Sequence, residues 1–281
     1  MENQSFNYRY PTVLSVAGSD NSGGAGIQAD LKTISALGAY GCTAITAITV
    51  QNTCGVKKIV PMNADVVGMQ MHAVCSDMKV DAMKTGMLHN ASIVREVSSI
   101  IKEYGLTNFV LDPVMIATSG DALSQDDLKK ALVEELFPLA TIITPNLPEA
   151  ENLLGHTITD ASEMEKAARE LLTLGPRAVL LKGGHLKGNR TIDILCLSST
   201  ETIRYETEKI DTVNLHGTGC TLSAAIATGL AQGKPIKEAV AFAQSYLNRA
   251  IYYGRKVRMG HGNGPVNHGW NPITMQLIET T

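Results

Sequence analysis

The feature that most constrains the fold is a regular alternation of short apolar runs with longer amphipathic segments along the whole chain. Strands that alternate with helices of this length form a mostly parallel sheet covered by helices on both faces. No repeat, low-complexity tract or Pro/Ser-rich linker interrupts the pattern. We therefore predict a single-domain, doubly wound α/β fold over residues 1–281, with its core at about 12–266. The predicted strands are residues 13–17, 42–50, 80–84, 108–111, 141–144, 178–182, 191–197 and 202–207, and the predicted helices are residues 25–37, 65–76, 90–104, 125–136, 160–174, 219–231 and 235–250.

The composition of the chain excludes several classes of protein. Hydrophobic residues make up 44% and charged residues 18%, as is typical of a packed globular chain. Lys and Arg number 24 against 27 Asp and Glu, and no basic stripe is visible, so we expect no nucleic-acid partner. The five cysteines form no C-x-x-C pair and the seven histidines form no H-E-x-x-H motif. These counts argue against a disulfide scaffold and against a zinc site.

The N-terminal residues are polar and contain no apolar signal-peptide core, so we expect a cytoplasmic protein. The stretch Thr33–Val56 carries no charge, but it contains Gly38, Gly41 and five threonines. These residues divide it into a helix end, a turn and a β-branched run. We therefore interpret it as buried core and expect no membrane partner.

Six segments rich in Gly, Pro or charge follow the predicted strands or precede a late helix. In an open α/β sheet the ligand binds beyond the carboxyl ends of the strands, where loops lead into helices. The number of unusual strand ends exceeds what turn formation alone requires, so we predict one ligand site at this edge. The segments are residues 18–26, 84–87, 112–115, 144–150, 182–185 and 214–221.

The segment His216–Thr221 (HGTGCT) directly precedes a strong helix former. Gly217, Thr218 and Gly219 can fold into a nest of N–H groups that binds a phosphate or a transferring phosphoryl group. Cys220 falls in the first helical turn, where the helix dipole lowers a thiol pKa and favours a thiolate or general base. The alternative is a tight turn with a buried structural cysteine.

Two common nucleotide-binding loops are excluded by spacing. The Gly-rich segment 18–26 lacks the acidic residue expected about 20 positions later, where residues 40–44 contain none. The segment Gly229–Pro235 has the wrong glycine spacing for a Walker A loop and no Ser or Thr after its lysine. A bound nucleotide must therefore be held by another arrangement.

Four polar positions lie at or just after the ends of predicted strands. Asn146 and Glu149 are spaced as a helix N-cap with its capping-box acid, and equally well as oxygen donors to Mg²⁺ and its waters. Asp112 places a carboxylate after a buried strand, directly before a proline. Lys182 ends an apolar strand before two glycines, so we expect its ammonium group to face a ligand.

Polar residues at two further places are candidates for a ligand contact. Asp30 lies early in a predicted helix, where an acidic residue can simply complement the helix dipole. Gln51 and Asn52 end a long apolar strand, and a polar pair in a half-buried position favours recognition of a ligand.

Ten segments form one ordered set from about residue 12 to residue 266: Ala17–Thr33, Gly38–Cys42, Val50–Thr53, Lys84–Leu88, Leu111–Met115, Ser119–Asp121, Thr144–Ala150, Leu181–His185, His216–Ser223 and Gly260–Val266. Together they resemble the hydroxymethylpyrimidine/phosphomethylpyrimidine kinases of thiamine synthesis, a branch of the ribokinase superfamily. The resemblance implies a ribokinase-like sheet and a homodimer. It also implies ATP-dependent phosphorylation of 4-amino-5-hydroxymethyl-2-methylpyrimidine and then of its monophosphate.

The resemblance implies roles for individual residues as well. Asp30 and Gln51 would hydrogen-bond the aminopyrimidine, and Met87 would pack on its ring. Lys182 and Asn146 would contact the phosphates of the co-substrate ATP.

The remaining roles implied by the resemblance concern the metal and the reacting atoms. Asp112 and Glu149 would hold Mg²⁺, largely through water. Residues 217–219 would form the anion hole, and Cys220 would act as the base where most sugar kinases of the superfamily carry an aspartate. Thr118 stands where many members carry a lysine, so the chain departs from the pattern there.

Two other functions remain open at this point. Close relatives of this branch phosphorylate pyridoxal or pyridoxine with the same cysteine, so a vitamin B6 kinase is the first alternative. A ligand sensor without catalysis is the second, and the full set of phosphate-binding residues argues against it.

Overall fold

The computed structural model describes residues 7–115, 122–184, 186 and 188–280. The described residues form a nine-stranded sheet and a separate short pair of strands, β1 (Tyr8–Arg9) with β11 (Ile278–Glu279). The six central strands of the large sheet are parallel, and both of its edges are antiparallel. In spatial order the strands are β10 (Thr202–Glu208), β9 (Arg190–Cys196), β8 (Val179–Lys182), β7 (Ile142–Ile143), β6 (Phe109–Leu111), β5 (Ala82–Thr85), β2 (Thr12–Asp20), β3 (Tyr40–Asn52) and β4 (Gly55–Pro61).

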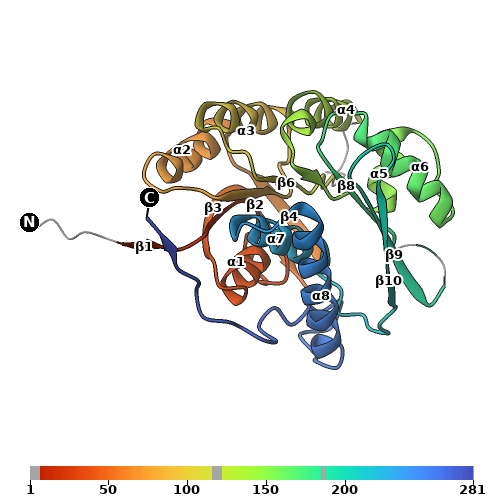
Figure 1. Cartoon of the computed structure of the whole chain (residues 1–281). Coiled ribbons are helices and arrows are strands. Elements are labelled where there is room, and N and C mark those ends of the chain that lie inside the picture. The colour runs from red at the N-terminus through yellow and green to blue at the C-terminus, as the bar shows by residue number, and fades with distance from the viewer. Residues whose placement is uncertain (1–6, 116–121, 185, 187, 281) are drawn as a thin grey trace, which may run out of the picture.

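Helices cover both faces of this sheet, which confirms the predicted α/β class (Figure 1). One face carries α2 (Ala64–Cys75), α3 (Ala91–Tyr104), α4 (Ala122–Ala131), α5 (Leu147–Leu154) and α6 (Ala161–Leu172). The other face carries α1 (Gly26–Ala36), α7 (Thr218–Ala231) and α8 (Ile236–Gly254).

Strand β2 explains why the parallel strands appear as continuous apolar runs in the sequence. Successive side chains point to opposite faces of a sheet. Leu14 and Val16 pack with the core under α2–α6, whereas Val13 packs with the core under α1, α7 and α8. Because both faces are covered, the residues on both sides of the strand have to be apolar.

The capping residues of two helices explain where these helices begin or end. Helix α3 is capped by Asn90, whose side chain accepts a hydrogen bond from the Ile93 N–H at 3.0 Å, and it ends at Gly105 with φ 61°. Helix α5 ends at Gly155 with φ 78°. The left-handed conformation at both helix ends favours glycine.

The predicted helices and strands all appear, but the sequence prediction missed β1, β4, α5 and β11. Strand β4 is an edge strand with mostly exposed residues, including two lysines, so it has no alternation of apolar and polar side chains to detect. Helix α5 has only 8 residues and is fixed by its caps rather than by a long apolar stripe. The predicted helix 125–136 begins three residues earlier than expected and ends in a π-helical turn, Leu132–Leu136, followed by the 3₁₀ turn Phe137–Leu139.

The order of the strands fixes the position of the site. From β2 the chain passes to β3 on one side, and then returns to β5 on the other side of β2. Such a reversal opens a crevice at the carboxyl ends of the two diverging strands, where ligands bind. Among the described residues, no helix combines the length and the apolar character needed to cross a bilayer.

Candidate active site

The N-terminus of α7 packs tightly against the loop that leads from β2 into α1. Gly217 precedes α7 with φ 83°, and a Cβ at this position would overlap the Gly24 carbonyl oxygen. A glycine is therefore required at residue 217 both for its conformation and for the close approach. This contact brings the N-terminal turns of two helices together at the switch point of the sheet.

Cys220 lies in the first turn of α7, as expected, with its side chain partly exposed. Burial raises the pKa of the Cys220 thiol to about 11; Lys84 and the Gly26 N–H oppose this rise, and the carboxylates of Asp30 and Asp112 add to it. The expected fall in pKa at a helix N-terminus is therefore wrong for the protein without ligands. Desolvation and two nearby carboxylates outweigh the helix dipole here.

Asp30 is fully buried, and both of its oxygens are paired. Lys84 Nζ lies 2.9 Å from Oδ1 and 2.8 Å from Oδ2, and the Ser15 hydroxyl donates to Oδ2 at 2.6 Å. Both members of the Asp30–Lys84 pair have no exposed side-chain surface. Burial alone would lower the pKa of Lys84, but the Asp30 carboxylate raises it, so the ammonium group stays charged. Asp30 is therefore fully paired within the protein, and its direct contact with the substrate stays a prediction.

Asp112 and Lys182 form a second ion pair, at the ends of β6 and β8. Lys182 Nζ lies 3.0 Å from Asp112 Oδ1, which also accepts a hydrogen bond from the Thr144 hydroxyl at 2.9 Å. A Cβ at Gly219 would lie 3.4 Å from Asp112 Oδ2 and 3.5 Å from Lys182 Nζ. The predicted anion hole and this ion pair therefore face each other.

Asn146 and Glu149 form the capping box of α5. The Asn146 side chain accepts from the Glu149 N–H at 2.9 Å, and Glu149 Oε2 accepts from the Asn146 N–H at 2.8 Å. Burial, opposed by Lys182 and reinforced by Asp112, raises the pKa of Glu149 to about 7. The structural interpretation of this motif is thus confirmed, and it leaves Glu149 Oε1 outside the capping box.

The predicted pyrimidine contacts lie on two other loops of the same edge. Gln51 is partly exposed near the end of β3, and its N–H donates to the Asn21 side chain at 2.8 Å. Met87 follows β5, and its methyl group packs so closely on Gly18 that a Cβ there would lie 2.5 Å from it. The structure therefore brings Gln51 and Met87 to the end of the site formed by β3, β2 and β5, and it brings four residues to the β6–β8 end: Asp112, Asn146, Glu149 and Lys182.

Comparison with known proteins assigns the family. Residues 20–267 match the family model described as phosphomethylpyrimidine kinase. The chain belongs to this kinase family. A hydroxymethylpyrimidine/phosphomethylpyrimidine kinase from Rhizobium meliloti is 50% identical over 257 residues, which cover 91% of this chain and 96% of that protein. The chain is accordingly a phosphotransferase that uses ATP as co-substrate.

Solved structures of related kinases share the fold. The phosphomethylpyrimidine kinase of Clostridium difficile is 44% identical with a TM-score of 0.74, and covers 85% of this chain and 99% of its own. The pyridoxal kinase of Bacillus subtilis, solved as an ADP complex, is 38% identical with a TM-score of 0.86, and covers 92% of this chain and 98% of its own. The chain thus has the fold that pyridoxal and phosphomethylpyrimidine kinases share.

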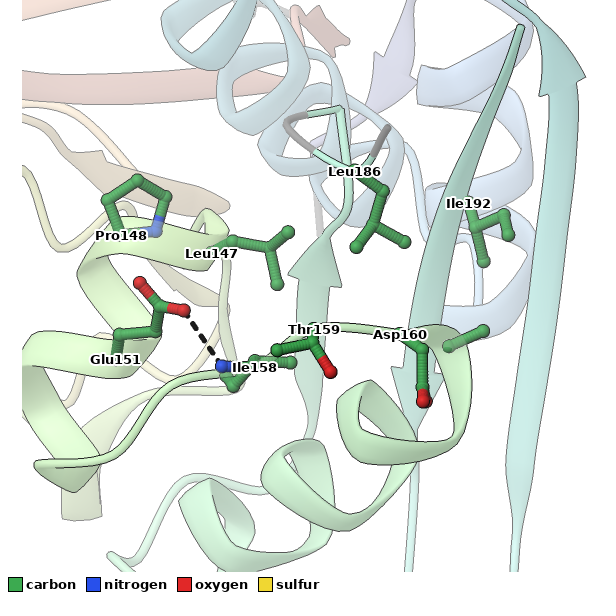
Figure 2. Close-up of a pocket in the computed structure, with 9 residues that line it drawn as sticks. Leu147, Pro148, Glu151, Ile158, Thr159, Asp160, Leu186 and Ile192 are labelled. Atoms are coloured by element: carbon green, nitrogen blue, oxygen red, sulfur yellow. Dashed lines mark hydrogen bonds between the residues drawn. The ribbon is translucent and has the colours of Figure 1, made fainter. Parts of the chain in front are cut away.

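A hollow of about 600 Å³ lies beside the kinase site but contains none of the predicted site residues. Its first lining residue, Leu147, directly follows Asn146, and the hollow lies between α5, α6 and β9 (Figure 2). Its two carboxylates are already used, because Glu151 accepts from the Ile158 N–H and Asp160 caps α6. The lining residues are Leu147, Pro148, Glu151, Ile158, Thr159, Asp160, Ala161, Leu186 and Ile192.

Sequence reasoning missed three residues of the site: Asp20, Lys84 and His216. Lys84 carried a signal, because a lysine interrupts a short apolar strand, but Asp20 and His216 look like ordinary loop residues. Thr118, the segment 119–121 and His185, which belonged to the expected motifs, lie outside the described residues.

Proposed function

We propose that this kinase phosphorylates 4-amino-5-hydroxymethyl-2-methylpyrimidine and then the resulting monophosphate, as in thiamine synthesis. The names of the full-length relatives support this substrate. The observation that carries the proposal is the position of Gly219, where a Cβ would lie 3.4 Å from Asp112 Oδ2 and 3.5 Å from Lys182 Nζ, in the same helical turn as Cys220. A phosphoryl group held there would contact the N–H groups of residues 217–219, the Lys182 ammonium group and the Cys220 thiol.

In the proposed reaction the pyrimidine hydroxyl oxygen attacks the γ-phosphorus while the bond to the ADP oxygen breaks. The anion hole of residues 217–219 stabilises the charge on the transferring group, and the Cys220 sulfur takes the hydroxyl proton. Cys220 must be a thiolate to do so. Lys84 and the Gly26 N–H lower its pKa, whereas the Asp112 carboxylate raises it, so neutralisation of Asp112 favours the base.

The carboxylates of Asp112 and Glu149 suit a magnesium ion. Within the described part of the chain, no three His, Cys, Asp or Glu side chains gather into a metal cage. Mg²⁺ requires no such cage, because it keeps several waters and binds through one or two carboxylates plus substrate phosphates. Burial, only partly opposed by Lys182, raises the pKa of Glu149, and a cation bound beside it would favour its charged form. When bound, Mg²⁺ would neutralise charge on the phosphates of ATP, with Lys182 and Asn146 contacting those phosphates.

We assign recognition of the pyrimidine to Gln51 and Met87, with Asp30 acting through Lys84. The Gln51 amide can pair with the polar edge of a ring, and the Met87 thioether can pack on its face. Gln51→Leu should abolish pyrimidine binding while ATP binding persists, because a site built for hydrogen bonds rejects a ligand that leaves them unmade. Calorimetric titration with each ligand separately tests this assignment, and equal loss of both ligands would contradict it.

Removal of the base tests the role of Cys220. Cys220→Ala should lower kcat by about 10²–10⁴ with little change in the KM for ATP. Cys220→Asp should restore part of the rate, because an aspartate is the base in most sugar kinases of the superfamily. Cys54→Ala, which alters an exposed thiol, is the matched control. Turnover near that of wild type in Cys220→Ala would mean that the thiol is structural.

A vitamin B6 kinase is the second candidate, favoured by the TM-score of 0.86 to the Bacillus subtilis pyridoxal kinase. The two substrates can be compared in one assay, with each offered alone and then in competition with Mg-ATP. Detection of the phosphorylated product by mass spectrometry identifies the better substrate. If pyridoxal competes successfully at equal concentration, the pyrimidine assignment is wrong.

We further propose that the kinase is a cytoplasmic homodimer formed through β3 and β4. Strand β4 is at the edge of the sheet, and the exposed apolar side chains Ile48, Val50, Val56 and Val60 lie on these two strands. An exposed apolar edge is well suited to pair with a second copy about a two-fold axis. The double variant Val56→Asp/Val60→Asp should sediment as a monomer, whereas the control Met69→Asp should not; a wild-type monomer would refute the dimer.

The proposed cytoplasmic location rests on the use of ATP as co-substrate. A fusion to a fluorescent protein that separates with the envelope fraction rather than with the soluble cell contents would contradict it.

A further inference from the structure

The carboxylate of Asp20 is the centre of the loop between β2 and α1. It is 1% exposed, and it accepts hydrogen bonds from the N–H groups of Ser22, Gly24 and Ala25 at 2.8–3.0 Å. Burial alone would raise the pKa of Asp20, but hydrogen bonds from Ser22, His216 and Ala25 lower it to about 2. Asp20 is therefore a fixed negative charge, around which the loop is folded.

His216 connects this loop to the loop that precedes α7. Its Nε2 donates to Asp20 Oδ2 at 2.9 Å, across 196 residues of sequence. Its backbone N–H donates to the Gly264 carbonyl oxygen at 3.1 Å, and the residue forms a β-bridge with Pro265. His216 is thus held from both sides, its imidazole by the Asp20 carboxylate and its backbone by the C-terminal segment.

The two loops also touch through glycines. A Cβ at Gly24 would lie 2.5 Å from His216 Cδ2, and a Cβ at Gly217 would overlap the Gly24 carbonyl oxygen. The loops therefore have no space between them in which one could shift without the other. The Asp20–His216 hydrogen bond is a charge-assisted contact across this junction.

The junction determines how two helix N-termini meet at the reacting atoms. Helix α1 provides the Gly26 N–H that donates to the Cys220 sulfur, and α7 carries Cys220 itself together with the anion hole of residues 217–219. We propose that Asp20 and His216 are a positioning pair that sets the anion hole and Cys220 for phosphoryl transfer. This inference rests on the roles proposed above for residues 217–220.

Substitution of His216 tests the positioning pair. His216→Leu keeps most of the bulk but loses the donor, and kcat should fall by about 10²-fold, since a misplacement of about 1 Å costs this much. The KM values for ATP and the pyrimidine should change by less than about threefold, because an interaction made only in the transition state lowers kcat without weakening binding. His216→Gln should recover most of the rate, because its amide nitrogen can donate to Asp20.

His156→Leu is the matched control, since it removes a contact of 3.1 Å between an exposed histidine and Glu170. The double variant His216→Leu/Cys220→Ala should be about as slow as the slower single variant, because both changes damage one unit. If His216→Leu does not fold, His216→Ala assayed with and without added imidazole makes the same comparison, and imidazole should restore turnover.

Three results would overturn the positioning pair: wild-type kcat in His216→Leu, a raised KM at unchanged kcat, or multiplying losses in the double variant. Failure of the proposed function has a different signature. If wild-type protein phosphorylates pyridoxal but no pyrimidine, the substrate is wrong, and the same variants are compared with pyridoxal. If Cys220→Ala turns over normally while His216→Leu does not, the base is wrong and the pair acts on the anion hole alone.

Discussion

The two lysine–carboxylate pairs of the site use the same groups in different surroundings. In the Asp30–Lys84 pair both side chains have 0% exposure, and both carboxylate oxygens contact the ammonium group. In the Asp112–Lys182 pair the exposures are 3% and 14%, and the ammonium group contacts only Oδ1. Asp112 Oδ2 faces Gly219 instead.

This difference separates positioning from binding. Taking charges out of water is costly, so a sealed pair is stable only when nearly all its hydrogen bonds are made within the protein. The Asp30–Lys84 pair therefore cannot bind a ligand without losing its own contacts. The Asp112–Lys182 pair reaches the surface of the site, where its charges can act on phosphates and a metal ion.

Loss of Lys84 should have the largest effect. Lys84→Met leaves Asp30 buried without its partner, which costs about 3–5 kcal/mol of unfolding free energy. The double variant Asp30→Leu/Lys84→Met should recover most of this stability, because no buried charge remains. Urea unfolding of the three proteins measures both effects, and a stable Lys84→Met single variant would show that the pair is not sealed.

The matched change in the Asp112–Lys182 pair should affect catalysis more than stability. Lys182→Met should lower kcat/KM for ATP by about 10²–10³, as expected for loss of one charge at a transferring phosphoryl group. Its unfolding free energy should fall by less than that of Lys84→Met, because Lys182 keeps 14% of its side-chain surface exposed whereas Lys84 keeps none. A steady-state kinase assay and urea unfolding together check this contrast. Equal stability losses in Lys84→Met and Lys182→Met would remove the distinction between the pairs.

Ionisation of Glu149 beside the Asp112–Lys182 pair should lower the unfolding free energy above neutral pH. The pKa of Glu149 is raised from 4.5 to about 7 in the folded protein. The stability that protonated Glu149 contributes is therefore fully present below pH 4.5 and is lost as the pH rises through 7. Glu149→Gln, which keeps a capping-box acceptor, should therefore raise the unfolding free energy at pH 8 by about 1–3 kcal/mol in magnesium-free buffer. The gain should vanish at pH 4.5. Thermal unfolding at both pH values measures the gain. A gain that persisted at pH 4.5 would assign the effect to another cause.

The smallest effect concerns Cys220, whose pKa responds to charges of both pairs. At pH 7 iodoacetamide should label the exposed Cys54 before Cys220, because only the thiolate reacts and the Cys220 pKa is about 11. Labelling of Cys220 should accelerate about tenfold per pH unit between pH 7 and 10. Peptide mass spectrometry over time measures each rate, and early labelling of Cys220 at pH 7 would indicate a thiolate at rest.

Much of the fold could be predicted from local sequence, since burial makes β2 a continuous apolar run and gives the amphipathic helices their periodic patterns. Strand β4 could not, because its residues are mostly exposed and its pairing depends on β3 alone. The strand ends predicted in the sequence do gather at one edge of the sheet. Their order there depends on the reversal between β2 and β5, which no local pattern records.

The sequence by itself determined which residue types stand at the carboxyl ends of the strands, because glycines, prolines and charges are rare inside buried segments. Only the tertiary structure decided which side chains each of these residues contacts. Asp30 pairs with Lys84 across 54 residues and Asp20 with His216 across 196, and neither spacing is visible to a pattern of 2 or 3.6 residues. The pKa of Cys220 shows the physical reason most clearly. Its helix position favours a low value, but burial and the carboxylates that the fold brings beside it raise the value to about 11.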